Sequence, residues 1–331
     1  MSKIELAIKF GSNEIIVYRK GFGIIAKVPA YLAVMRDGKK VKIKATGKNA
    51  EKFLYSNPDN VEVLCPIHNS VIVDEKMATA LLTEVFKTVI EDKFMVSGIS
   101  ALVAIPSTLN ETQLIQIKRV LLSSGISKVE FVYNSVCARE ELELDPHSHL
   151  MVVDIGKFLT DITVNNEFNF TFGRTYFIGG ADMDKSVTTF VRDNHGLEIS
   201  DRTSEQIKNE VATLYERDLN RTEYIGFDDN GKLVKRSISA NEVRVAIQGE
   251  YAKIVELVHD CLKLLSKDVA KDLYSTGIMF VGGASSISGF YEYLKKQMDY
   301  PIIITEAPAD SVIMGAGKLL GAQKEFMKIK V

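Results

Sequence analysis

The sequence is poor in cysteine and contains no tryptophan. Its three cysteines, Cys65, Cys137 and Cys261, are widely separated and odd in number. This arrangement does not resemble the disulfide framework of a secreted protein. A protein of a reducing compartment is therefore expected.

Long apolar runs and an excess of basic charge are also lacking. No run of about 18 apolar residues occurs, so no membrane-spanning helix is expected, and Met1–Glu5 does not begin a signal peptide. The net charge of −2 argues against a nucleic-acid partner, because such proteins usually carry a basic excess. Cys65 with His68, and His147 with His149, lack further ligands, so no metal site is expected. The sequence predicts a soluble, cytoplasmic protein.

What the chain has is the length and composition of two folded domains. Its 331 residues exceed one usual core, and 46% hydrophobic with 25% charged residues is ordinary for a folded protein. A strand pattern interrupted by a turn runs from Ile4 to Tyr18, and a second runs from Leu150 to Val164, after Pro146. Alternating helices and strands follow each hairpin. This repeat predicts a duplicated α/β fold that restarts at Pro146.

The spacing of apolar residues places the other elements. Met77, Leu81 and Val85, for example, share one face at helical spacing. The predicted helices cover residues 49–55, 75–91, 111–123, 135–144, 183–194, 204–215, 241–265 and 289–297. The predicted strands cover residues 31–35, 41–45, 99–105, 129–132, 150–155, 161–164, 277–281 and 302–305. The stretch 216–235 is polar and contains the hairpin-like Asp229-Asn230-Gly231.

Two turns rich in glycine and small polar residues are candidate phosphate loops. Gly11-Ser12-Asn13 lies in the first hairpin, and residues 156–160 lie at the same place in the second. Backbone N–H groups at such turns can form a nest for an anion, although turn glycines usually serve only the turn. The mirrored placement favours phosphate binding. The pairs Gly179-Gly180 and Gly282-Gly283, each before a helix, would let a backbone approach a nucleotide closely.

Several segments resemble, in order and spacing, the MreB family of bacterial actin-like filament proteins. They are residues 151–156, Gly179-Gly180 with Met183-Asp184 after it, residues 204–210, Gly282-Gly283-Ala284 and residues 315–318. The likeness covers essentially the whole chain. It implies a duplicated RNase H-like, actin-like fold. Domain I would cover residues 1–145 with a small subdomain at about 31–64, and domain II residues 146–331 with a small subdomain at about 182–245. The C-terminal helix is expected to pack back on domain I.

The resemblance also implies a site for an adenine nucleotide, ATP or ADP. Glu205 and Lys208, one helical turn apart, would contact the ribose and the adenine, although their spacing alone favours an ordinary surface ion pair. The other implied nucleotide-binding residues are Gly11, Ser12 and Asn13 in the first loop, Asp154, Gly156, Lys157 and Phe158 in the second, Gly180, and Gly282, Gly283, Ala284 and Ser285 beneath the adenosine.

Three parts of the family's hydrolytic machinery are altered. Lys9 stands where the family has an acid that handles the metal, and Lys157 and Phe158 replace two loop glycines. Tyr133 and Asn134 occupy the positions of two glutamates that orient the attacking water. Slow hydrolysis is expected, because neutral groups cannot take the proton that a glutamate could. Two alternatives stay open: Lys9 and Lys157 replace part of the charge of Mg²⁺ and make it dispensable, or Lys157 and Phe158 fill the phosphate pocket.

The resemblance thus predicts a cytoskeletal pseudo-ATPase that polymerises with itself or with other MreB-type protomers, for cell shape or motility. The alternative is an active ATPase or small-molecule kinase of the same superfamily, against which Tyr133 and Asn134 argue. A contact with the inner face of the cell membrane is a further hypothesis, based on Phe94, Met95 and Val96. The competing interpretation is that this short apolar run enters the core.

Overall fold

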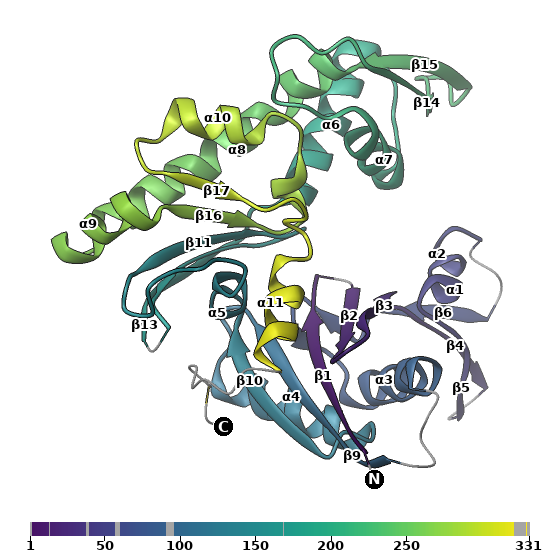
Figure 1. Ribbon diagram of the computed structural model, residues 1–331. Coiled ribbons are helices and arrows are strands. Elements are labelled where there is room, and N and C mark those ends of the chain that lie inside the picture. The colour runs from purple at the N-terminus through teal and green to yellow at the C-terminus, as the bar shows by residue number, and fades with distance from the viewer. Residues whose placement is uncertain are drawn as a thin grey trace. The chain divides into compact units, whose positions relative to one another are not determined.

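The computed structural model describes residues 2–12, 14–37, 40–56, 60–90, 96–167, 169–320 and 329. The chain divides into two compact units (Figure 1). Unit 1 comprises Met1–Pro146, Glu167–Asn169 and Asp310–Val331, and unit 2 comprises His147–Asn166 and Phe170–Ala309. Each unit is built around its own hydrophobic core.

Unit 1 is based on a five-stranded sheet with the order β10-β9-β1-β2-β3. Its strands are β1 (Ser2–Phe10), β2 (Glu14–Arg19), β3 (Gly23–Pro29), β9 (Val96–Ile105) and β10 (Lys128–Tyr133). β1 and β2 form the first predicted hairpin, while β1, β9 and β10 run parallel. Its longer helices are α3 (Glu75–Val89), α4 (Glu111–Ser123), α5 (Asn134–Arg139) and α11 (Ser311–Leu319), of which α11 packs against α5 and β1.

A small three-stranded sheet with the order β5-β4-β6 completes unit 1. It contains β4 (Leu32–Asp37), β5 (Lys40–Thr46) and β6 (Val61–Leu64), with the short helices α1 (Lys48–Glu51) and α2 (Phe53–Ser56) between β5 and β6. The two-residue strands β7 (Ile67–His68) and β8 (Val71–Ile72) follow β6 in the sequence and pair with each other. The predicted helix over residues 49–55 is therefore two single turns.

Unit 2 repeats the large sheet of unit 1. Its order is β13-β12-β11-β16-β17, with an antiparallel hairpin β11–β12 and parallel β11, β16 and β17. The strands are β11 (Leu150–Ile155), β12 (Thr160–Asn165), β13 (Phe170–Tyr176), β16 (Ile278–Val281) and β17 (Ile302–Ile304). In both units an N-terminal hairpin continues into parallel strands on one side and a third antiparallel strand on the other. The two sheets are separate, so the predicted duplication is confirmed.

Unit 2 also contains a two-stranded sheet of β14 (Arg221–Phe227) and β15 (Leu233–Ser239), and its described residues form five helices of eight or more residues. They are α6 (Gly180–His195), α7 (Asp201–Val211), α8 (Ala240–Lys263), α9 (Lys267–Thr276) and α10 (Phe290–Gln297). Figure 1 shows α8 and α10 stacked over β17 and β16, and Tyr251, Phe280 and Phe290 form the aromatic contact between these layers. Ser239 and Glu242 form the capping box that begins α8.

Three further predicted stretches differ from the structure. The helix expected over 204–215 is α7, which begins at Asp201 because the Ser200 side chain caps it, and ends at Val211 before an extended Ala212. The helix expected over 135–144 is α5, which ends at Arg139. The polar stretch 216–235 contains all of β14 and the start of β15, a hairpin whose outward side chains are largely exposed.

No helix among the described residues is both long and apolar enough to span a bilayer. The predicted membrane contact involves Phe94 and Met95, which lie outside the described residues.

Candidate functional site

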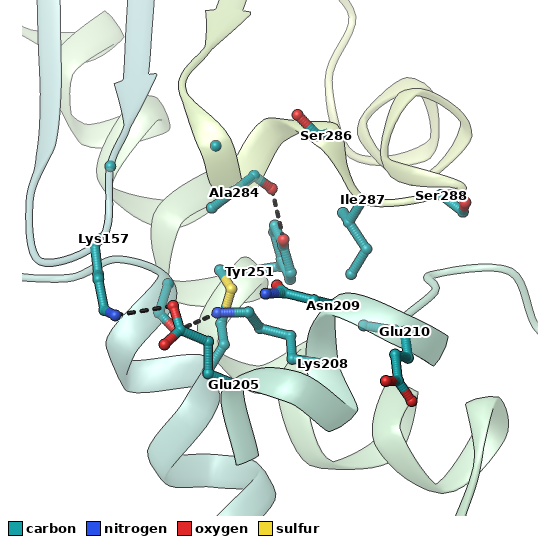
Figure 2. A pocket seen from close by; sticks show the side chains of 15 residues that line it. Lys157, Glu205, Lys208, Asn209, Glu210, Tyr251, Ala284, Ser286, Ile287 and Ser288 are labelled. Atoms are coloured by element: carbon teal, nitrogen blue, oxygen red, sulfur yellow. Dashed lines mark hydrogen bonds and ion pairs between the residues drawn. The ribbon is translucent and has the colours of Figure 1, made fainter. Parts of the chain in front are cut away.

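A cavity of about 390 Å³ lies in unit 2, where the turn of the β11–β12 hairpin, α6, α7, α8 and the segment after β16 meet. Its volume is within the range of small-molecule sites, about 300 to 1,000 Å³. Figure 2 shows the side chains that surround it. The residues that line it are Gly156, Lys157, Gly180, Met183, Glu205, Lys208, Asn209, Glu210, Ala212, Tyr251, Gly283, Ala284, Ser286, Ile287 and Ser288.

The first wall is the hairpin turn resting on the start of α6. The Gly156 carbonyl accepts a hydrogen bond of 3.0 Å from the Gly180 N–H, and the Lys157 carbonyl accepts one of 2.7 Å from the Ala181 N–H. A Cβ at Gly179 would lie only 2.6 Å from the Gly156 carbonyl oxygen. The glycine at 179 therefore allows the turn to satisfy the first donors of the helix.

The Lys157 side chain reaches from this turn to α7. Its Nζ lies 2.8 Å from Glu205 Oε1, and the two side chains are 37% and 40% exposed. Figure 2 shows this ion pair at one side of the cavity, next to Lys208. The second predicted loop and the first predicted ribose-contacting residue are thus joined directly.

Lys208 is held much more firmly than Lys157. Its Nζ lies 2.7 Å from Asp184 Oδ1, with side chains only 16% and 9% exposed, and it donates to the Gly180 carbonyl at 3.1 Å. Burial raises the pKa of the Asp184 carboxyl, and the Lys208 ammonium opposes that shift. The pair fixes α7 to α6 behind the cavity.

Replacing Asp184 by Asn is expected to destabilise unit 2 by about 3 kcal/mol, because it leaves the largely buried Lys208 ammonium without a counter-charge. Urea unfolding followed by circular dichroism measures this. Asp260→Asn is the matched control, since it breaks an ion pair with Lys263 whose side chains are 54% and 73% exposed, and it should leave the midpoint unchanged. Equal effects of both substitutions would contradict the assignment.

The opposite wall is the segment that follows β16. Gly282 has a φ of 91°, and a Cβ there would lie 2.6 Å from Asp154 Oδ1, so this sharp exit from the strand requires glycine. The 3-10 helix η2 (Gly283–Ser286) then borders the cavity. Beneath it the Tyr251 hydroxyl donates to the Ala284 carbonyl at 2.7 Å (Figure 2). Tyr251 is 1% exposed, and this burial raises the pKa of its phenol.

Seven of the predicted nucleotide-binding residues line this cavity. They are Gly156, Lys157, Gly180, Glu205, Lys208, Gly283 and Ala284. Asp154, Phe158, Gly282 and Ser285 are close in sequence but do not line it. The Ser285 hydroxyl instead donates to the Val281 carbonyl at 2.8 Å, so its role is to support the turn.

Eight further lining residues were missed by the sequence analysis. Tyr251 comes from the middle of a long helix, where an apolar periodic pattern indicates only core. Asn209 and Ala212 lie about one turn beyond Glu205 and Lys208, and this periodicity could have identified them. The others are Met183, Glu210, Ser286, Ile287 and Ser288.

The other predicted residues belong to unit 1. Gly11 and Ser12 form the β1–β2 turn, in which the Gly11 N–H donates to the Glu14 carbonyl at 2.7 Å; Asn13 lies outside the described residues. Lys9 lies in β1, and Tyr133 and Asn134 lie where β10 gives way to α5. Lys9 is therefore near the end of a central strand, and Tyr133 is at the end of an edge strand of the same sheet.

Glu14, which the sequence analysis did not consider, follows the same turn. Burial raises the pKa of its carboxyl, and the neighbouring Lys27 and Lys9 oppose the shift. It is an acidic group close to Lys9. Among the described residues, no three or more His, Cys, Asp or Glu side chains gather as a metal site would require.

A family model described as MreB/Mbl protein matches residues 3–328. The chain belongs to the MreB/Mbl family. It is thus a cytoskeletal protein of the actin-like class, and the predicted family is confirmed.

Curated relatives agree over nearly the full length. The chain is 26% identical over 322 residues to the cell shape-determining protein MreB of Escherichia coli K12, covering 96% of this chain and 93% of that protein. It is 25% identical over 331 residues to the cell shape-determining protein Mbl of Bacillus subtilis, covering 99% and 98%.

Solved structures of MreB5 and MamK confirm the actin-like fold. MreB5 of Spiroplasma citri bound to ADP superposes with a TM-score of 0.86 at 22% identity, covering 96% of each chain. A MamK double helical filament superposes with a TM-score of 0.80 at 16% identity, covering 98% of this chain and 100% of that chain.

Proposed function

We propose that this chain binds an adenine nucleotide in the cavity of unit 2 and assembles into filaments. The observation that carries the binding proposal is that the cavity is bordered by both the hairpin turn with Lys157 and the glycine segment with Gly283, two elements of the sequence-predicted site. In support, S. citri MreB5 structures are described as bound to ADP and to AMPPNP. MamK, of the same fold, is described as a double helical filament.

The lining residues fit such a ligand chemically. The ammonium group of Lys157 can receive a phosphate oxygen, and the carboxylate of Glu205 can accept hydrogen bonds from ribose hydroxyls. Gly283 has no side chain and is exposed, so a flat base can approach its backbone closely. Phe158 does not line the cavity, which supports nucleotide binding over a phosphate pocket filled by both loop residues.

The proposal includes slow hydrolysis and a reduced requirement for Mg²⁺. Tyr133 and Asn134 replace the two glutamates, and Lys9 replaces the acid that handles the metal. Phosphoryl transfer depends mainly on positioning and charge neutralisation. Lysine ammonium groups supply positive charge near the phosphates, as Mg²⁺ would, but unlike a metal ion they carry no bound water that could be activated for attack. The rival proposal, an efficient ATPase or kinase, requires groups that these positions lack.

Assembly is tested by sedimentation. The chain at increasing concentration, with ATP, with ADP or with neither, is centrifuged and the pelleted fraction is measured. We expect a pellet that appears above a threshold concentration, because a head-to-tail contact that does not close on itself generates a fibre. Monomer at every concentration, nucleotide and salt would exclude filament formation by this chain alone.

Membrane contact remains a proposal of the same kind. Its sequence basis is the apolar run at Phe94–Val96, and the relatives add only that MreB and Mbl are cell shape-determining proteins.

A further inference from the structure

The cavity holds two lysines whose charges are satisfied in very different ways. Lys208 pairs with a carboxylate that is 9% exposed, and it also donates to a backbone carbonyl. Lys157 pairs with Glu205, and both side chains keep more than a third of their surface in solvent. A buried pair is costly to break, whereas an exposed pair is worth only about 0 to 1 kcal/mol. Lys157 is therefore the lining cation that a ligand can recruit at little cost.

The ion pair also joins two different elements of the site. Lys157 belongs to the hairpin turn between β11 and β12, and Glu205 belongs to α7. Both line the same cavity. A ligand that carries both an anionic group and hydroxyl groups offers each partner a replacement: the anion takes the ammonium, and the hydroxyls donate to the carboxylate. A neutral nucleoside offers only the second.

We propose that the Lys157–Glu205 ion pair is a latch that the phosphate group of a nucleotide opens, so that Lys157 selects phosphorylated nucleotides over unphosphorylated nucleosides without a divalent cation. The inference rests on the proposed nucleotide binding. Opening exchanges one charge-assisted contact of Lys157 for another and frees Glu205. Adenosine carries no anionic group that can take the ammonium in place of Glu205, so it gains nothing at Lys157.

The test compares adenosine, AMP and ADP by equilibrium dialysis in EDTA. Lys157→Met should weaken ADP binding by about tenfold or more, the worth of a charge-assisted hydrogen bond, and leave adenosine binding within about twofold. Lys157→Arg should retain the preference for ADP, which also shows that the site folds. Glu205→Gln removes the competing carboxylate and should raise the ratio of ADP to adenosine affinity.

The matched control is Lys263→Met, which removes the same charge from an exposed ion pair on α8 and should change none of the affinities. Equal loss of adenosine and ADP binding in Lys157→Met, or no loss of either, would overturn the latch. Neither outcome would overturn the proposal that the wild-type chain binds a nucleotide in this cavity. A wild-type chain that binds none of the three ligands would overturn the proposed function and the latch with it.

Discussion

Phosphate release by this chain is expected to be at least about a hundredfold slower than that of E. coli MreB at the same occupancy by ATP, since a positioned general base typically contributes about 10² to 10⁴. Tyr133 precedes α5, and Asn134 is its first residue and is 6% exposed. Neither group can accept a proton from water as a glutamate can. The lysine at position 9 removes a second contribution, because a cation does not bind the metal that would neutralise the transferred phosphate.

Occupancy must be measured first, so that slow release is not mistaken for an empty site. Bound ATP is quantified by dialysis, and phosphate release is then followed at saturating nucleotide. Restoring both carboxylates, as Tyr133→Glu with Asn134→Glu, should recover only part of the deficit, because Lys9 is unchanged. A wild-type rate similar to that of E. coli MreB would refute the prediction.

The duplicated fold could be predicted because its signal is local and occurs twice. The hairpins of residues 4–18 and 150–164 are each an apolar run, a turn and a second apolar run, and strands in these patterns pair with their neighbours. The helices over 75–89 and 111–123 have both a continuous apolar face and an N-cap residue, Asp74 or Asn110. Their observed bounds accordingly differ little from the predicted ones.

The elements that were missed are those in which tertiary contacts override a weak local pattern. β14 and β15 bury Tyr224 and Ile238 on one face only, and Ile225 and Leu233 on the other are more than half exposed. Their sequence is therefore mostly polar with scattered apolar residues, and it gives no clear strand pattern. The strands are nevertheless formed because the inward residues join the core of unit 2.

The site shows the same division. The positions of its glycines could be inferred from the turns that need them, as at Gly282. The partner of Lys157 could not, because side-chain direction depends on the fold, and 48 residues separate it from Glu205. Tyr251 is likewise recognisable as part of the site only once α8 lies beneath η2.

Gly315→Ala is expected to destabilise unit 1 by about 3 kcal/mol, at the upper end of the usual cost of overpacking. Gly315 lies in α11, where a Cβ would overlap the Cys137 carbonyl and lie 2.6 Å from its carbon. Cys137 belongs to α5, all of whose residues are buried, so the obstacle is fixed backbone rather than a flexible side chain. The methyl group can be accommodated only if α11 moves away from α5 and β1, which opens the interior of the sheet.

The control is the same substitution in a helix with free space. Gly249 lies in α8, where its added Cβ would have no atom within 4 Å apart from its chain neighbours and the local helix backbone. Gly249→Ala should therefore stabilise unit 2 by about 0.5 to 1 kcal/mol, because alanine has the higher helix propensity. Urea unfolding of the two variants should therefore shift in opposite directions from the wild type. Because α5 begins at Asn134, displacement of α11 should also alter the environment of Asn134. A stabilised Gly315→Ala variant would show that α11 does not pack against α5 at this distance.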